Sequence, residues 1–139
     1  MRHAAMALAA SVLAVSGCSG PSSVQDARTQ VDAFHGLLDK GDFESVWNDS
    51  TQDIKATTSK ESFTGLLTAV HSRMGTVKET KQTGWKVNTD TNGTFASVTM
   101  QTTFERGSAT EEFVYRKTDA GYKLAGYQIK ADEPAAAAK

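Results

Sequence analysis

The spacing of the apolar residues changes once along this chain, at Gly75, and that change limits the folds that are open to it. Before Gly75, apolar residues recur every three or four positions, as they do on the buried stripe of a helix. After Gly75 they alternate with polar residues, as they do in a strand with one buried face. A helical half followed by a half made of strands predicts an α+β domain, in which the helices cover one face of an antiparallel sheet.

The first part of the helical half predicts two helices. The first has its apolar stripe between Val24 and Leu38, with Ser22 or Ser23 placed to cap its start and Gly41 to end it. Asp42 can cap a short second helix.

The second part predicts one more helix. Residues 48–57 form a polar stretch without a helical pattern, which we expect to be a connection. Thr58 and Glu61 then have the spacing of a capping box and predict the start of a third helix. This helix should end at Gly75, where a left-handed C-cap is expected.

Three turn signals divide the rest of the chain into four predicted strands. The clearest is Asn92-Gly93, because both residues tolerate positive φ; the others are Arg106-Gly107-Ser108 and Asp119-Ala120-Gly121. The predicted fold is therefore α+β, with N-terminal helices packed on a curved four-stranded antiparallel meander sheet in a single domain, residues 24–130. The side chains predicted to pack on the helices are Trp85, Val87, Val98, Met100, Phe104, Phe113, Tyr115, Tyr127 and Ile129.

The amino terminus has the features of an export signal. Residues 4–15 are almost continuously small or apolar, a stretch too short to span a bilayer but typical of a secretory signal peptide. Leu13–Cys18 resembles the bacterial lipobox, in which the cysteine thiol is acylated before cleavage, here between Gly17 and Cys18. The sequence thus predicts a signal peptide at residues 1–17, a lipidated Cys18 followed by a linker to Ser23, and a disordered tail at residues 131–139.

The predicted lipid places the mature domain at a membrane of the bacterial envelope. In lipoproteins an aspartate after the cysteine favours retention in the inner membrane, and Ser19 stands there instead. The expected location is the outer membrane, facing the periplasm.

The composition argues against several kinds of function. A formal net charge of −1 gives no basic field for nucleic acid, and the only cysteine is the predicted lipid anchor, Cys18. No metal-ligand, nucleophile-elbow or phosphate-loop motif occurs, so we expect no metal, no cofactor and no catalysis. Among the residues that could do acid–base chemistry, we expect His35 and His71 to be surface or boundary side chains, and Asp49, Asp53 and the Glu111-Glu112 pair to be solvated.

Several segments are similar to a known family. The stretches "LLDKGDFESVWNDS", "TSKESFTGLLTAVHSRMG" and "GYKLAGYQIK" resemble the DUF4019 group of small exported bacterial proteins of unknown function. The resemblance spans about residues 24–130 and implies a cystatin-like or NTF2-like fold; it transfers no catalytic residue. Phe63 and Tyr122 stand where such chains often carry tryptophan. The residues that carry the resemblance are Asp39, Gly41, Trp47, Arg73, Gly75, Gly126 and Tyr127.

Two hypotheses about function remain. The first is a protein-binding module of the envelope, for example an immunity-type inhibitor that neutralises a periplasmic toxin. The alternative is a pocket for a small molecule or lipid between sheet and helices, lined by the inner-face aromatics and Met100. For the first hypothesis the candidate surface is the outer face of the sheet, with solvent-facing residues Thr99, Gln101, Thr103, Glu112, Arg116 and Gln128.

Overall fold

The computed structural model describes residues 21–132 and has four helices followed by four strands. The predicted signal peptide, Cys18 and residues 133–139 of the predicted tail lie outside the described residues. The helices are α1 (Ser22–Lys40), α2 (Phe43–Asp49), α3 (Gln52–Thr57) and α4 (Lys60–Met74); the strands are β1 (Val77–Asp90), β2 (Gly93–Phe104), β3 (Gly107–Thr118) and β4 (Gly121–Ala131).

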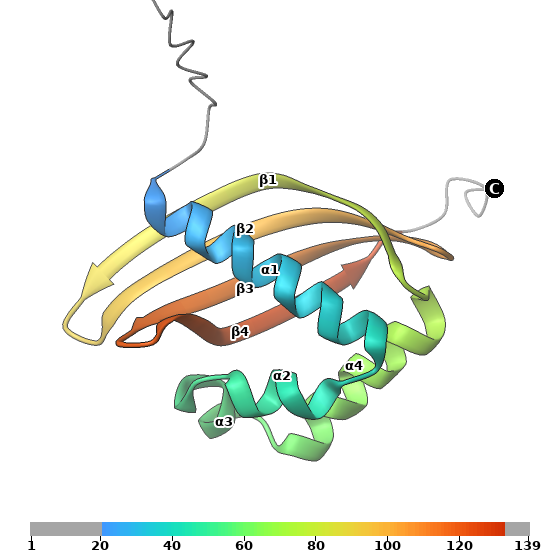
Figure 1. Cartoon of the computed structure of the whole chain (residues 1–139), viewed down its shortest axis with the longest axis horizontal. Helices are drawn as coiled ribbons and strands as arrows, with labels where there is room; N and C mark the ends of the chain where they lie inside the picture. The colour runs from blue at the N-terminus through green and yellow to red at the C-terminus, as the bar shows by residue number, and fades with distance from the viewer. Residues whose placement is uncertain (1–20, 133–139) are drawn as a thin grey trace, which may run out of the picture.

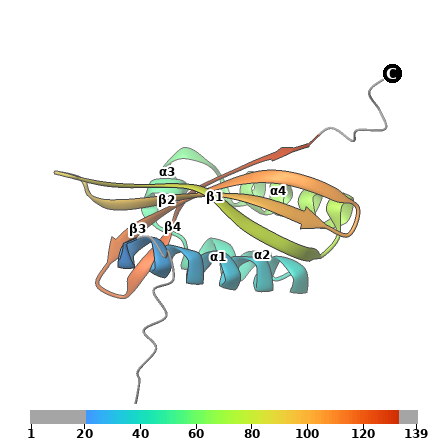
Figure 2. The same ribbon diagram turned by 90° about the horizontal axis from the view of Figure 1, so that it is seen from above.

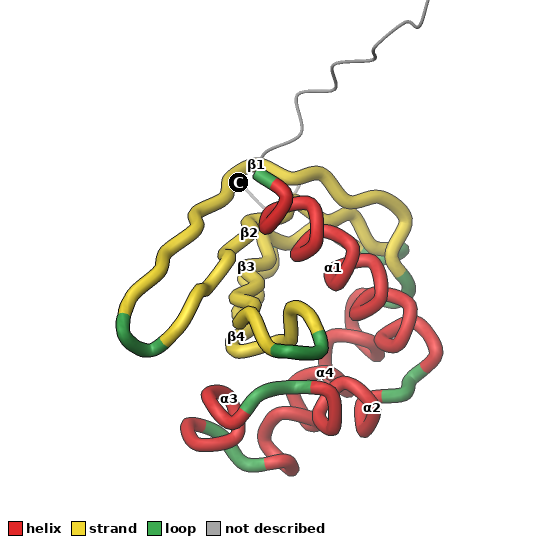
Figure 3. Tube along the Cα trace, turned by 60° about the vertical axis from the view of Figure 1, so that its left-hand side comes forward, coloured by secondary structure: helices red, strands yellow, loops and turns green. Residues whose placement is uncertain are grey.

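The arrangement confirms the predicted α+β class. The strands form one antiparallel sheet in the order β1-β2-β3-β4, a meander joined by short turns. The sheet is curved, and α1 runs across one of its faces (Figures 1 and 2). In Figure 3 the helices α2, α3 and α4 gather beyond β4, at the other end of the molecule from the β1 edge.

The helix boundaries agree with the sequence in part. Gly41 ends α1 in the left-handed conformation, and the Asp42 carboxylate accepts the Ser45 N–H at the start of α2, both as predicted. The predicted serine cap of α1 is wrong, because that helix already includes Ser22 and has Pro21 at its N-cap.

The segment predicted as a connection contains an additional helix. Residues 52–57 form α3, and its Ile54 is buried in the core. The cap of α4 is one residue later than the predicted capping box: Ser59 accepts the Ser62 N–H at 3.1 Å.

Gly75 forms the corner between the two halves of the chain. Its φ of 79° is positive as predicted, although its ψ of −156° is not that of a left-handed cap. A Cβ atom there would also lie 2.9 Å from Cβ of Glu105. Both the backbone conformation and the lack of space therefore require glycine where helix changes to strand.

The sheet has an inner face toward α1 and an outer face away from it. Ala96, Val98, Met100 and Thr102 alternate on the inner face of β2 and are fully buried. Two bulges interrupt β1, between Val77 and Glu79 and between Gln82 and Gly84. A bulge reverses which residues face inward, so the alternation in β1 does not run evenly from end to end.

The two edges of the sheet differ. The Thr51 N–H donates to the Leu124 carbonyl at 2.8 Å, so the chain before α3 pairs with the edge of β4. Ala131 and Asp132, which the sequence assigns to the tail, instead extend the sheet: Ala131 ends β4, and the Asp132 N–H bonds the Ser108 carbonyl. The edge of β1 pairs with no other strand among residues 21–132.

Candidate functional site

The outer face brings together four of the six residues predicted to bind a protein. Thr99 pairs with Glu112, and Glu112 pairs with Gln128, so the three lie in one row across three strands. Gln101 lies two positions along β2, where its amide donates to the Asp132 carboxylate. Thr103 is separated from them, exposed near the turn between β2 and β3. The row borders a shallow hollow of about 170 Å³ lined by Thr99, Thr110, Glu112, Gln128, Ile129 and Lys130.

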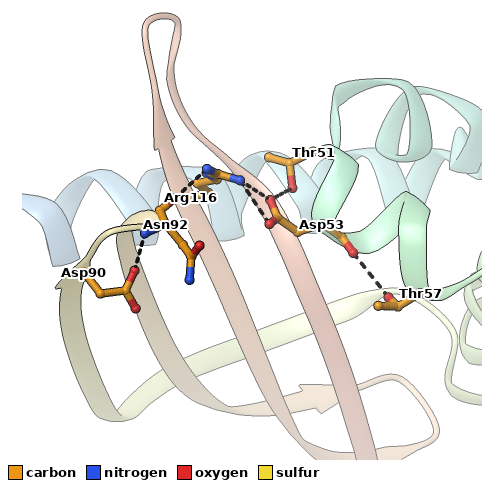
Figure 4. Close-up of polar contacts among 6 residues, drawn as sticks. All are labelled: Thr51, Asp53, Thr57, Asp90, Asn92 and Arg116. Carbon is orange, nitrogen blue, oxygen red and sulfur yellow. Dashed lines mark hydrogen bonds and ion pairs between the residues drawn. The ribbon is translucent and has the colours of Figure 1, made fainter.

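Arg116, the sixth residue, is not a free solvent-facing side chain as expected. Its Nη1 donates to both carboxylate oxygens of Asp53, at 3.0 and 3.1 Å, and its Nη2 donates to the Asn92 carbonyl at 2.5 Å (Figure 4). The guanidinium also lies 5.4 Å from the ring centre of Phe95. Arg116 therefore ties β3 to α3 and to the β1–β2 turn, and a charge reversal there would disturb the fold.

The same contacts correct the expectation that Asp53 is simply solvated. The Thr51 hydroxyl donates to the Asp53 carboxylate at 2.7 Å and lowers the pKa of that carboxyl below its ordinary 3.8. Partial burial opposes the shift, and Arg116 adds to the lowering. A carboxyl whose pKa is lower in the folded state than in the unfolded state contributes to stability at pH values above its unfolded pKa. This contribution is lost as the pH falls through its folded pKa.

We expect Asp53→Asn to destabilise the protein at neutral pH by less than about 1 kcal/mol, because the ion pair is partly exposed to water. The difference from wild type should vanish as pH falls below the folded pKa of Asp53, where the wild-type carboxyl is also neutral. Urea denaturation at a series of pH values measures this, with the exposed Asp119→Asn as control. A difference that persisted in acid would contradict the ionic explanation.

The environment of Trp85 differs from the prediction. It pairs with the buried Val98 and so lies on the inner face as predicted, but 50% of its surface is exposed, so its assignment to the core is wrong. The reason is its place in the edge strand, where the helices leave half of the side chain uncovered. Trp85 lies in a regular part of this strand, because from Gly84 to Asp90 β1 pairs with β2 without a bulge.

The interior contains a polar cluster that the sequence analysis missed. Glu111 is fully buried and His35 is 5% exposed, which contradicts the expectation that both are surface or solvated residues. Oε1 of Glu111 lies 2.8 Å from His35 Nε2 and accepts the Thr102 hydroxyl at 2.6 Å; Oε2 accepts the Tyr127 hydroxyl at 2.6 Å. If Glu111 is ionised, its oxygens can only accept, so the imidazole proton must be on Nε2. Every oxygen of this carboxyl is thus engaged inside the core.

The remaining predicted surface residues behave as expected. His71 is partly exposed, with its ring 5.9 Å from that of Phe43, and Asp49 is exposed at the end of α2.

A pocket of about 150 Å³ lies between α1, α2 and the two last strands. It lies between sheet and helices, as the alternative hypothesis expects, and Tyr115 is among the predicted aromatics that line it; Met100 and Phe113 do not line it, because they are packed in the core. The walls are mostly apolar, with Phe34, Leu37 and Val46 from the helices.

Tyr115 lines this pocket and is 2% exposed. Its hydroxyl is buried and has no hydrogen-bond partner within residues 21–132. Burial raises the pKa of this phenol well above 10.0, and the charges of Glu111 and Asp32 raise it further, so the hydroxyl keeps its proton and remains a donor. Leaving such a group unpaired costs about 1–3 kcal/mol.

Residues 21–132 contain neither a cluster of metal ligands nor a membrane-spanning helix. No three of the histidine, cysteine, aspartate and glutamate side chains in this part of the chain come together as metal ligands. None of its helices is long and apolar enough to cross a membrane.

The comparison with known proteins agrees with the resemblance drawn from the sequence. Among curated proteins, no match was found. The model of the DUF4019 family, described as a protein of unknown function, matches residues 30–127, which include all four strands up to Tyr127 and most of the helices. This chain therefore belongs to the DUF4019 family.

Proposed function

We propose that this protein is a non-catalytic binding module of the bacterial cell envelope, which holds an extended segment of a partner protein along the edge of β1. Cys18, acylated as its sequence context predicts, would tether the module to the membrane. The tether raises the effective concentration of the module for partners at the same surface.

The observation that carries this proposal is the uncovered edge of the longest strand. β1 has 14 residues, ends the sheet, and exposes Trp85, whereas the β4 edge is already paired at Leu124 with the chain before α3. An exposed edge strand presents unpaired backbone donors and acceptors, which an extended peptide can complete as an added strand. A large aromatic side chain beside such an edge is a typical anchor for binding energy.

The side chains of β1 define the chemistry of the partner. Trp85 faces inward and Lys86, paired with Ser97, faces outward, so neighbouring positions offer an aromatic surface and a positive charge. Lys78 adds positive charge along the same strand, whereas Lys81 lies 3.7 Å from the Glu79 carboxylate and is partly neutralised by it. A partner segment that alternates an apolar residue with an acidic one complements both faces, since successive side chains of a strand point to opposite sides. The lysines also discourage pairing between two copies of this edge.

The polar cluster supports the non-catalytic part of the proposal. His35 and Glu111 are the buried acid–base pair of the described structure, and acid–base catalysis needs a group within reach of a substrate. Both side chains are enclosed, and the carboxylate oxygens are occupied by protein donors. This cluster is better suited to fixing α1 on the sheet than to turnover.

One specific form of the proposal is an immunity-type inhibitor, in which the segment held at β1 belongs to a toxin delivered into the periplasm. The product of a neighbouring gene would then be the first partner to test.

The test has two steps on the full-length protein. First, a photo-crosslinking residue is placed at Asn88 on β1 or at Glu112 on the outer face, both of which are exposed. Crosslinks formed at Asn88 but not at Glu112 support the edge. Crosslinks formed only at Glu112 would favour the outer face and overturn the edge proposal.

Second, the affinity of the identified partner is measured for three variants. Trp85→Ala should weaken binding about tenfold or more, as expected for an aromatic anchor. Lys86→Glu should weaken it too, and its effect should shrink as salt is added. Glu112→Lys is the matched charge change on the outer face and should leave the affinity unchanged. Equal affinities for all three variants and wild type would contradict binding at β1.

A further inference from the structure

The turn between β1 and β2 carries a side chain that the fold itself does not use. Asn92 is exposed, and its side-chain amide makes no hydrogen bond within residues 21–132, whereas its main-chain N–H donates to the Asp90 carboxylate at 2.7 Å. In Figure 4 the Asn92 side chain points away from Arg116. The next residue is Gly93, which has no side chain to shield its main-chain nitrogen. This nitrogen can therefore approach the side-chain carbonyl carbon of Asn92.

The Arg116 guanidinium lies against the peptide group that joins Asn92 and Gly93. Its Nη2 donates to the Asn92 carbonyl oxygen at 2.5 Å, and a Cβ atom at Gly93 would lie 3.4 Å from its Nε. Asp53 holds Nη1 of the same guanidinium with two hydrogen bonds. The oxygen and the nitrogen of a peptide group share charge by resonance. A cation fixed at the oxygen therefore stabilises the peptide group when its nitrogen has lost the proton.

We propose that Asn92 is a modification site, which loses its side-chain amide spontaneously and becomes isoaspartate under the influence of Arg116. In the first step the Gly93 N–H gives its proton to water, and the nitrogen bonds to Cγ of Asn92 while the bond from Cγ to Nδ2 breaks. Ammonia leaves, and a succinimide ring remains. Asp90 and Gly93 are the last register pair between β1 and β2, and terminal pairs open more readily than the middle of a sheet, so the Gly93 nitrogen becomes free to react.

Arg116 also selects the product of the second step. Water opens the ring at one of its two carbonyl carbons and breaks the bond from that carbon to the Gly93 nitrogen. Attack at the main-chain carbonyl carbon places negative charge on the oxygen that Arg116 contacts, so this route is favoured. The chain then continues through the side-chain carbonyl, which is the isoaspartate linkage. The former main-chain carbonyl becomes a carboxylate beside Arg116, where the two charges form an ion pair.

The modification would change the charge and the length of this turn. It adds a negative charge, and it lengthens the main chain between β1 and β2 by a carbon atom. The reaction uses neither Trp85 nor Lys86, so it succeeds or fails independently of partner binding at β1.

The test follows the full-length protein during incubation at neutral pH for several weeks. Trypsin cleaves after Lys86 and Arg106, so a single peptide contains both Asn92 and Asn88. Mass spectrometry detects the exchange of NH2 for OH at each position, and chromatography against synthetic peptides separates isoaspartate from aspartate. Asn88 is also exposed but precedes Thr89, whose branched side chain shields the nitrogen, and it is the internal control. We expect conversion at Asn92, mainly to isoaspartate, before any at Asn88. Equal rates at both positions would overturn the proposal.

Two variants test the role of Arg116. Arg116→Gln should slow the conversion of Asn92 about tenfold, a factor that one hydrogen bond from a charged group can supply. A turn that was merely looser would convert faster, so a slower rate separates the two explanations. Asp53→Asn is the control, because it also breaks the link to α3 but leaves the guanidinium beside the turn, and it should convert at least as fast as wild type. Conversion in Arg116→Gln as fast as in wild type would contradict the proposal.

The wild type unfolded in guanidinium chloride tests the same point without a substitution. Arg116 no longer lies beside Asn92 in the unfolded chain, so the share of isoaspartate among the products should fall. Equal shares in the folded and unfolded protein would show that Arg116 does not select the product.

Discussion

Replacing Glu111 with alanine should cost about 3–5 kcal/mol of the free energy of unfolding, as expected when one member of a buried polar pair is removed. The variant leaves the His35 ring and the hydroxyls of Thr102 and Tyr127 without their shared acceptor in a part of the core that water does not reach. Since small domains are stable by only about 5–15 kcal/mol, this loss is a large part of the total. Urea denaturation followed by circular dichroism measures it.

The neighbouring residue offers a matched control. Glu112 is the next carboxylate on β3 but is exposed on the outer face, so Glu112→Ala should change stability by no more than about 0.5 kcal/mol. Glu111→Gln, which keeps the shape and one acceptor oxygen, should lie between Glu111→Ala and wild type. A Glu111→Ala variant as stable as the Glu112→Ala control would show that the cluster does not stabilise the fold.

Phe113→Ala should have an effect of similar size for a different physical reason. Phe113 is fully buried, and its ring lies 5.0 Å from that of Phe34 on α1 and 5.1 Å from that of Tyr127 on β4. Its truncation removes apolar contacts and leaves a cavity between helix and sheet, which costs about 3–5 kcal/mol. Thermal unfolding should show a correspondingly large fall in melting temperature.

Trp85→Ala is the informative comparison, because the sequence pattern places both aromatic side chains on the same face. Trp85 is the larger residue but is half exposed, so its truncation should cost about 1 kcal/mol or less. The variant should thus remain folded in the binding experiment at β1. A loss as large as that of Phe113→Ala would mean that Trp85 is packed in the core after all.

Much of the fold could be predicted because its elements carry strong periodic patterns. The stripe of α1 and the alternation in β2 each repeat several times, and glycines with positive φ stand at 41 and 75 where helices end. The helix α3 was missed because its six residues include one large apolar side chain, Ile54, too few to form a periodic stripe. Its burial depends on contact with β4, a partner far away in the sequence.

The polar cluster could have been found from the same patterns. Strand alternation puts Thr102 between Met100 and Phe104 and puts Glu111 two residues before Phe113, so both side chains point inward. His35 follows Val31 by four positions and therefore lies on the buried stripe of α1. A buried carboxyl requires partners. What the patterns could not provide was the identity of those partners, because His35 and Glu111 are separated by 76 positions.

Alternation also fails at Trp85 for a physical reason. It tells which face of the sheet a side chain occupies, but not how far the covering helices extend. That limit depends on the crossing of α1 over the sheet, which no local pattern encodes (Figure 1).

The pairing of Thr51 with Leu124 has a consequence for stoichiometry. Open sheets can grow at both ends, and a chain with two free edges can link copies into an endless fibre. Here the chain before α3 already pairs with the β4 edge at Leu124, whereas the β1 edge pairs with no other strand among residues 21–132. A partner strand added at β1 thus finds the opposite edge partly taken, which disfavours repeating the same contact along a fibre. We therefore expect a complex built through β1 to hold one guest per copy of this chain.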